Sequence, residues 1–290
     1  MHLPKILVFG KSGQLGSALQ HLSEGHPAFE IKVMGRPEAD LTNHGRIASL
    51  LKSENPVGLI NAAAYTAVDD AEADEAQAFA LNAVATHWLA KCAQELDIPL
   101  IHISTDYVFD GAQSTPYTPE DNIAPINAYG RSKLAGEWAC LGTHPSKSYV
   151  VRTSWVYSEW GSNFVKTMLK LGETRDVLSV VDDQVGSPTY VVDLAQACLK
   201  MMQQIVAGRV DNPGVYHYSN AGTCSWYEFA QEIFHSSDGM TVSKTTSDNF
   251  PRPARRPQFS KLDTTKVEQV FGLQPRLWRE ALQSCLERLT

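Results

Sequence analysis

The chain has 290 residues, 43% of them hydrophobic and 20% charged, which is typical of a globular protein with one large domain or two closely joined ones. Its net charge of −7 argues against nucleic acid as the main partner, because phosphate backbones are bound by basic surfaces. Five scattered cysteines without a CxxC pair, and a start without a secretory signal, predict reduced thiols and a cytoplasmic protein. No apolar run approaches the roughly 20 residues that span a bilayer, so we expect no membrane partner.

In the first half, short apolar runs alternate with longer amphipathic ones. We expect strands over residues 5–9, 31–34, 57–60, 100–104 and 149–152, and helices over 14–22, 47–52, 76–96 and 129–141. Such alternation predicts βαβ units and a parallel sheet that is covered by helices on both faces.

Beyond residue 155 the alternation is less regular. We expect helices over 163–171, 191–205, 226–234, 264–271 and 277–289, and strands over 178–181 and 215–219. The pattern predicts a doubly wound parallel α/β sheet (a Rossmann fold) with a smaller C-terminal α/β substrate lobe. We place the dinucleotide-binding domain at residues 1–155 and the substrate lobe at 156–290, with part of 188–206 packing back on the first domain.

Three glycines follow the first strand, at positions that suit a dinucleotide. Gly10, Gly13 and Gly16 allow a tight turn, close approach of a pyrophosphate, and close packing of helix on strand. The following helix begins at Gln14 and Leu15, where free N–H groups favour phosphate. A P-loop would need a glycine at the position of Lys5, so that interpretation fails.

The second strand is followed by Arg36, where NAD-binding folds commonly carry an acidic residue for the ribose. An arginine suits a 2′-phosphate, so NADPH is favoured and NADH is the alternative cofactor; a solvated surface arginine is the other interpretation, and the sequence does not decide between them. Asp40 and Leu41 are expected beside the adenine. After the third strand come small residues and then Ala64, Tyr65 and Thr66, which we expect near the cofactor at the carboxyl edge of the sheet.

Two segments carry the expected chemistry. Tyr129 and Lys133 lie four residues apart, so they share one face of a helix. A neighbouring ammonium lowers the pKa of a phenol towards the working range of an acid–base catalyst. A hydroxyl from Ser104 or Thr105, at the end of a strand, can hold a substrate oxygen during hydride attack.

At this point the sequence resembles the extended short-chain dehydrogenase/reductases and, within them, the dTDP-4-dehydrorhamnose reductases. The resemblance runs through nearly the whole chain in order, and its matching stretches are residues 9–16, 61–69, 104–109, 129–133, 152–157, 163–168, 183–189 and 253–257. It implies reduction of the 4-keto group of a nucleotide-activated deoxysugar, with dTDP-4-dehydro-L-rhamnose giving dTDP-L-rhamnose in polysaccharide biosynthesis.

The resemblance also implies roles for single residues. Tyr129 is the proton donor, Lys133 holds the nicotinamide ribose, and Thr105 lies at the substrate carbonyl. Gly13, Gln14 and Leu15 line the pyrophosphate. The other residues expected around the sugar nucleotide, all within the matching stretches, are Asp106, Trp155, Asn163, Arg255 and Arg256.

The sequence leaves alternatives open for several residues. Trp155 also fits a core aromatic, and Arg255 and Arg256 also fit solvated charges instead of a diphosphate clamp.

Relatives that dimerise around Mg²⁺ carry glutamates where this chain aligns Ala18 and Val192, so we expect no metal, and a monomer or a metal-independent dimer. The histidines lack metal-ligand spacing, which makes His102 and His217 structural. A regulatory subunit resembling that of methionine adenosyltransferase, and a reductase or epimerase for another nucleotide sugar, are the competing functions.

Overall fold

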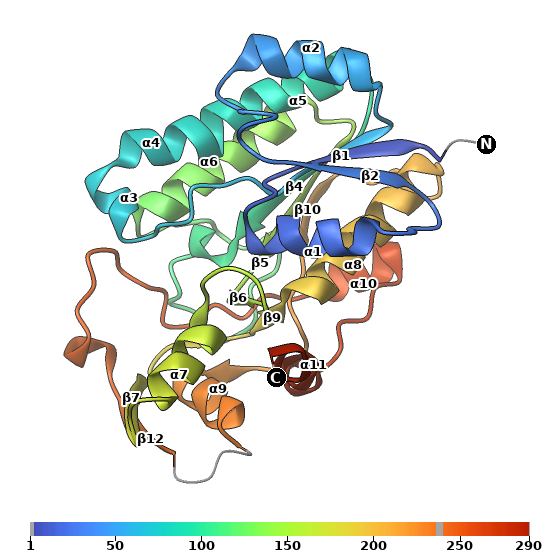
Figure 1. Ribbon diagram of the computed structural model, residues 1–290. Helices are drawn as coiled ribbons and strands as arrows, with labels where there is room; N and C mark the ends of the chain where they lie inside the picture. The colour runs from blue at the N-terminus through green and yellow to red at the C-terminus, as the bar shows by residue number, and fades with distance from the viewer. Residues whose placement is uncertain (1–2, 236–239, 290) are drawn as a thin grey trace.

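A computed structural model describes residues 3–235 and 240–289, and its centre is a six-stranded parallel sheet (Figure 1). The strands lie in the order β10-β5-β4-β3-β1-β2. Their bounds are β1 Lys5–Phe9, β2 Glu30–Met34, β3 Gly58–Asn61, β4 Leu100–Thr105, β5 Ser148–Thr153 and β10 Gly214–His217. The chain reverses its winding between β1 and β3, and open α/β sheets bind their ligands at this kind of switch point.

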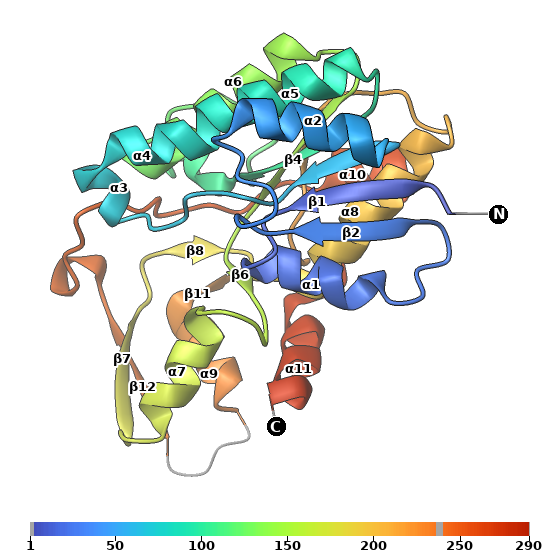
Figure 2. The same cartoon turned by 45° about the horizontal axis from the view of Figure 1, so that its top comes forward.

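Helices cover both faces of the sheet because its strands are apolar on both sides. Ile6 and Val8 of β1 face α1 (Gln14–Ser23) and α8 (Val191–Val206), whereas Leu7 and Phe9 face α2 (His44–Glu54) and α5 (Ala85–Glu95). Figures 1 and 2 show α2, α5 and α6 (Ala128–Thr143) on one side and α1, α8 and α10 (Thr265–Phe271) on the other. The predicted doubly wound fold is confirmed.

The predicted helical stretch at residues 76–96 contains an irregular turn. It consists of α4 (Glu75–Phe79), a π-helical turn η1 (Ala80–Val84) and α5. The wider turn was not predicted, because an Ala-rich sequence carries no signal for it. Such π turns are frequent at functional sites, and this one carries the buried Asn82.

A smaller group of elements lies away from the sheet (Figure 2). Its elements are α7 Phe164–Gly172, β7 Val177–Val181, β8 Val185–Gly186, β11 Cys224–Ser225, α9 Trp226–Ile233 and β12 Thr241–Thr245. The short strands β8, β11 and β12 were missed, as were β6 (Val156–Tyr157) and β9 (Thr189–Tyr190). A short helix, α3 (Asp70–Ala73), precedes α4. The last helix, α11, spans Trp278–Leu289.

The chain crosses between these two parts more than once. Although β10, α8 and α10 come from the second half of the sequence, β10 extends the main sheet beside β5, and α8 packs on α1. The division into residues 1–155 and 156–290 stays a prediction. Within the described residues, no helix combines the length and the apolar character needed to cross a bilayer.

Candidate functional site

A cavity of about 850 Å³ opens at the carboxyl ends of the central strands. The lining residues that the sequence predicted for the cofactor are Gly10, Gly13, Gln14, Leu15, Arg36, Asp40, Leu41, Ala64, Tyr65, Thr66, Tyr129 and Lys133. Those predicted for the substrate are Ser104, Thr105, Asp106 and Trp155. Segments from distant parts of the chain therefore meet in one hollow at the switch point of the sheet.

The glycine turn is shaped by close backbone contacts. Gly10 has a φ of 108°, and a Cβ there would lie 2.7 Å from the backbone of Ala62 on the neighbouring strand segment. Gly16 does not line the cavity; a Cβ there would lie 2.0 Å from the Gly10 carbonyl oxygen, so its role is to let α1 pack against the turn. The N-cap of α1 is Gly13, which offers no capping side chain, so the first turn of the helix presents its N–H groups to the cavity.

Arg36 and Asp40 lie together in the lining of the cavity. The Arg36 side chain is 83% exposed, and its Nε lies 3.3 Å from Asp40 Oδ2. Asp40 also accepts hydrogen bonds from the hydroxyl and the amide of Thr42, and these bonds, reinforced by Arg36, lower the pKa of its carboxyl. Arg36 is thus an exposed cation in the cavity wall, paired with Asp40.

The loop after β3 is held by the π turn. Asn82 accepts from the Tyr65 amide at 2.8 Å and donates to the Tyr65 carbonyl at 3.1 Å and to Ser132 Oγ at 2.9 Å. Ser132 in turn donates to the Tyr129 carbonyl. One buried amide thus joins the loop that lines the cavity to the helix that carries Tyr129 and Lys133, and no pattern in the sequence indicated this role.

Tyr129 and Lys133 lie on the first turns of α6, which begins after the N-cap Asn127. Both side chains are buried, at 9% and 2% exposed, and both line the cavity. Burial raises the pKa of the Tyr129 phenol, while the Thr105 hydroxyl beside it acts in the opposite direction. Burial also lowers the pKa of Lys133 to about 8, against an opposing effect of Glu137.

Lys133 is not among the groups that shift the pKa of Tyr129 here, and its predicted action on the phenol stays a prediction. The Lys133 Nζ donates to the Ile103 carbonyl at 2.7 Å and lies 3.4 Å from His102 Nε2. In this geometry burial determines the pKa of Tyr129, and the opposing contact comes from Thr105. Spacing on a helix places the two side chains on one face, and a carbonyl of the neighbouring strand then takes one proton of Lys133.

The two hydroxyls at the end of β4 point to different surroundings. Thr105 donates to Asp106 Oδ1 at 3.0 Å within the cavity wall, and burial raises the pKa of Asp106 to about 6. Ser104 instead donates to Glu137 Oε1 at 2.5 Å. The Ser104 hydroxyl proton is therefore engaged by this buried carboxylate, although Ser104 and Thr105 both line the cavity.

Trp155 is held in an unusual position. Its φ is 48°, a left-handed conformation that is strained for a bulky residue, and its indole stacks on Trp226 of α9 at 3.6 Å between ring centroids. Both rings line the cavity. Trp226 was not predicted, because its helical spacing looks the same as that of a core residue. The stack brings the smaller group of elements to the edge of the cavity.

The three remaining substrate candidates do not line the cavity. Asn163 is the N-cap of α7, and its side chain donates to Gln14 Oε1 at 3.1 Å and to the Ser158 carbonyl. Arg256 forms a two-pronged ion pair with Asp69, and Arg255 is exposed, with its carbonyl accepting from Asn127. Direct contact of these three residues with the substrate stays a prediction. In this structure Asn163 bonds to Gln14, and the arginine segment lies beside the start of α6.

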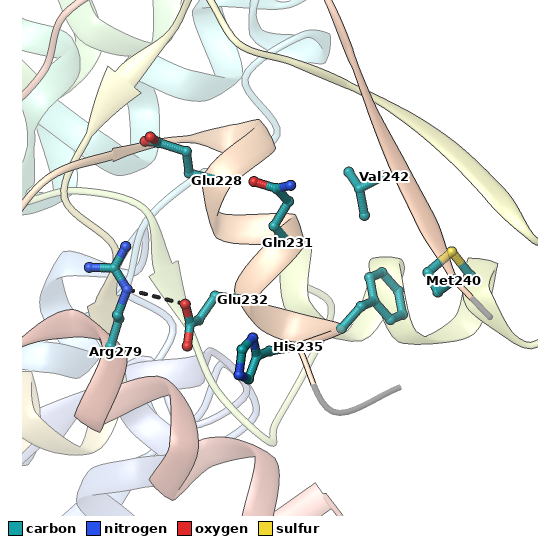
Figure 3. A pocket seen from close by; sticks show the side chains of 8 residues that line it. Glu228, Gln231, Glu232, His235, Met240, Val242 and Arg279 are labelled. Carbon is teal, nitrogen blue, oxygen red and sulfur yellow. Dashed lines mark hydrogen bonds and ion pairs between the residues drawn. The ribbon is translucent and has the colours of Figure 1, made fainter. Parts of the chain in front are cut away.

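A second, smaller hollow is lined by other residues, from α9, β12 and α11 (Figure 3). It has a volume of about 400 Å³. Glu232 pairs with Arg279 across it at 3.1 Å, and Glu228 at its edge caps the start of α9. None of the residues predicted for a site lines this hollow.

Comparison with known proteins gives a consistent result. The chain matches the family described as the RmlD substrate binding domain over residues 4–290. It is 39% identical over 289 residues to a dTDP-4-dehydrorhamnose reductase of Aggregatibacter actinomycetemcomitans, with 97% of this chain and 98% of the relative covered.

Two solved structures are similarly close. A dTDP-4-dehydrorhamnose reductase of Clostridium acetobutylicum superposes with a TM-score of 0.92 and 40% identity, covering 98% of this chain and 99% of that one. One from Bacillus anthracis, in complex with NADP, gives a TM-score of 0.91 and 37% identity, with 99% of each chain covered.

Proposed function

The chain belongs to the RmlD substrate-binding-domain family, and from that premise we propose that it reduces the 4-keto group of a nucleotide-activated deoxysugar with NADPH. The substrate that the family relationship favours is dTDP-4-dehydro-L-rhamnose, which gives dTDP-L-rhamnose. The observation that carries the proposal is the convergence of Thr105, Tyr129 and Lys133 with the glycine turn in one cavity.

The cavity fits a dinucleotide by its shape and its donors. Because Gly10 has no Cβ, the turn can lie directly against the backbone of Ala62. The first turn of α1 then offers N–H groups for a pyrophosphate. When bound, the nicotinamide supplies the hydride for the sugar carbonyl. Lys133 would hold the ribose, and Arg36 would face the 2′-phosphate.

The remaining chemistry is a proton transfer by residues of this chain. Thr105 would bind the carbonyl oxygen after its hydroxyl rotates away from Asp106, and Tyr129 would donate the proton to the oxygen that becomes an alkoxide. Because burial raises the pKa of Tyr129, its phenol is protonated at neutral pH and ready to act as the acid. Stacked on Trp226, Trp155 would form an apolar wall beside the sugar.

The direct test is oxidation of NADPH followed with a panel of nucleotide 4-keto sugars that differ in base and in sugar. We expect turnover with the dTDP-activated 6-deoxy-4-keto sugar. Turnover with a different member of the panel alone would identify another nucleotide-sugar reductase, and no turnover with any member would contradict the proposal.

Replacing Arg36 by Ala should weaken NADPH binding by up to roughly 1.5–3 kcal/mol, the scale of a charge-assisted hydrogen bond, and leave NADH nearly unchanged. Isothermal titration with both cofactors measures the effect. Arg46→Ala is the matched control, because Arg46 is also exposed in this region but bonds to the Pro37 carbonyl and does not line the cavity. Equal losses of affinity for both cofactors in Arg36→Ala would show that Arg36 does not recognise the 2′-phosphate and contributes only general positive charge.

Activity and oligomeric state should be indifferent to EDTA and to added Mg²⁺. Ala18 and Val192, at 0% and 4% exposed, lie in the apolar core that α1 and α8 share, and neither side chain can bind Mg²⁺. Sedimentation with and without chelator measures the oligomer, in parallel with the NADPH assay. A dimer that dissociates in EDTA would show that another carboxylate provides a metal site.

The affinity for NADPH should fall as the pH rises above about 8. Burial lowers the pKa of Lys133 to that value, so its ammonium loses the proton earlier than an exposed lysine does. Below this pH Lys133 is charged and can donate to the ribose. The Kd for NADPH measured from pH 6.5 to 9.5 tests this expectation, and a constant Kd up to pH 9.5 would contradict it.

A further inference from the structure

A buried chain of polar groups lies behind Lys133, on the side away from the cavity. Lys133 Nζ lies 3.4 Å from His102 Nε2, and His102 Nδ1 lies 3.2 Å from Asn61 Nδ2. His102 is 0% exposed and Asn61 is 1% exposed. The proposed mechanism uses neither His102 nor Asn61, although this row of polar groups ends at Lys133, which the mechanism does use.

The orientation of the Asn61 amide follows from its other neighbours. The Ala63 amide donates to one side-chain atom at 3.2 Å, which must therefore be the oxygen. Thr86 donates its only hydroxyl proton to the Asn82 carbonyl at 2.9 Å, so its oxygen can only accept from the nitrogen of Asn61, at 3.4 Å. The contacts with Ala63 and Thr86 therefore agree that Nδ2 of Asn61, a donor, faces the His102 ring.

This orientation determines the state of the imidazole. Because Asn61 donates to it, Nδ1 of His102 must carry a lone pair, and the proton of the neutral ring is on Nε2. Burial and the nearby Lys133 both lower the pKa of His102, so the ring is neutral at working pH. An Nε2–H group therefore faces the Lys133 ammonium, which cannot donate to it.

We propose that His102 is a positioning residue for Lys133: held by Asn61 with its proton on Nε2, it turns the lysine ammonium towards the cavity. One ammonium proton goes to the Ile103 carbonyl at 2.7 Å, and the remaining two are left for groups in the cavity. With the other tautomer, Nε2 would accept a second proton and anchor the ammonium in the core. The inference rests on the proposed function, because it is the cofactor ribose that these two protons would bind.

The other titratable groups near the Lys133 ammonium lie on α6. Glu137 and Cys140 lie further along α6 and raise the pKa of Lys133, and Tyr129 lies one turn before it. Glu137 is itself paired with Arg152 of β5 at 2.7 Å. Gly136 lets α6 pack closely on η1, since a Cβ there would lie 2.1 Å from the Asn82 carbonyl oxygen; the same Cβ would lie 3.3 Å from His102 Nε2.

The tautomer is tested by ¹⁵N–¹H correlation spectra of the full chain labelled at histidine, with the His102 signals identified by their loss in His102→Phe or His102→Gln. We expect a neutral ring with protonated Nε2 from pH 6.5 to 8. A proton on Nδ1, or a doubly protonated ring, would overturn the proposal. This measurement involves no turnover, so it stands apart from a failure of the proposed ketoreductase activity.

The effect on Lys133 is tested by Asn61→Asp, in which a carboxylate would accept from Nδ1–H and move the lone pair to Nε2. We expect the tautomer to switch, and the pH above which NADPH affinity falls to move up by about one unit or more, because Lys133 gains an acceptor. Asn61→Ala, which removes the donor without adding charge, should give a mixture of tautomers. His144→Phe is the control, since that buried imidazole contacts the Ile98 carbonyl at the far end of α6. An unchanged NADPH profile despite a switched tautomer would show that His102 only fills space.

Discussion

Tyr129→Phe is expected to lower turnover on the order of 10²–10⁴-fold, because it removes the proton donor and leaves the ring. The ring should stay in place, since it packs edge-on against Tyr107 with 5.6 Å between centroids. The Kd for NADPH should remain nearly that of the parent. Steady-state kinetics together with cofactor titration separate the two quantities.

Tyr157→Phe provides the control for this loss of a buried phenol. The Tyr157 hydroxyl is buried without a hydrogen-bond partner among the described residues, and it does not line the cavity. We expect full activity and a stability equal to that of the parent or above it, because no bond is lost. Turnover of Tyr129→Phe within a few-fold of the parent would remove Tyr129 from the mechanism.

Arg152→Met should destabilise the fold by about 3–5 kcal/mol, the cost of leaving a buried charge without its partner. Arg152 and Glu137 are each 1% exposed, and the guanidinium bonds both carboxylate oxygens, at 2.9 and 2.7 Å. Urea unfolding of the parent and the variant measures the difference in the free energy of unfolding.

The double variant Arg152→Met/Glu137→Met should regain much of this stability, because neither charge of the pair is then left without its partner. Lys244→Met supplies the comparison at the surface: its partner is Asp182, its side chain is 61% exposed, and we expect a loss below about 1 kcal/mol. A small loss in Arg152→Met would mean that Glu137 takes up a proton or reaches water in the variant.

Sequence reasoning was most successful where the chemistry is local. The glycine turn at Gly10 follows from chain geometry, because any side chain there would meet the adjacent strand segment. The placing of Tyr129 and Lys133 on one face of α6 follows from helical periodicity, and both residues line the cavity. Short apolar runs predicted every strand of the central sheet, although β10 was expected in the smaller lobe and lies beside β5 instead.

The exceptions concern residues whose partners are distant in the chain. Asn163 and Arg256 look like ligand-binding residues, but they are occupied by Gln14 and Asp69, which lie 149 and 187 positions away. Ser104 and Thr105 look equivalent, but neighbouring residues of a strand face opposite sides, and Ser104 meets Glu137. No local pattern records such partners.

The sequence by itself therefore determined the parallel α/β class, the glycine turn after β1, and the placing of Tyr129 and Lys133 on one helix face, because these depend on backbone sterics and on periodicity within a few residues. Only the tertiary structure decided which polar side chains remain available to a ligand, that Trp226 joins Trp155, and that Asn61 and His102 lie behind Lys133. The physical reason is that a hydrogen bond or a ring stack commits a side chain according to distance in space, and folding brings together residues that are far apart along the chain.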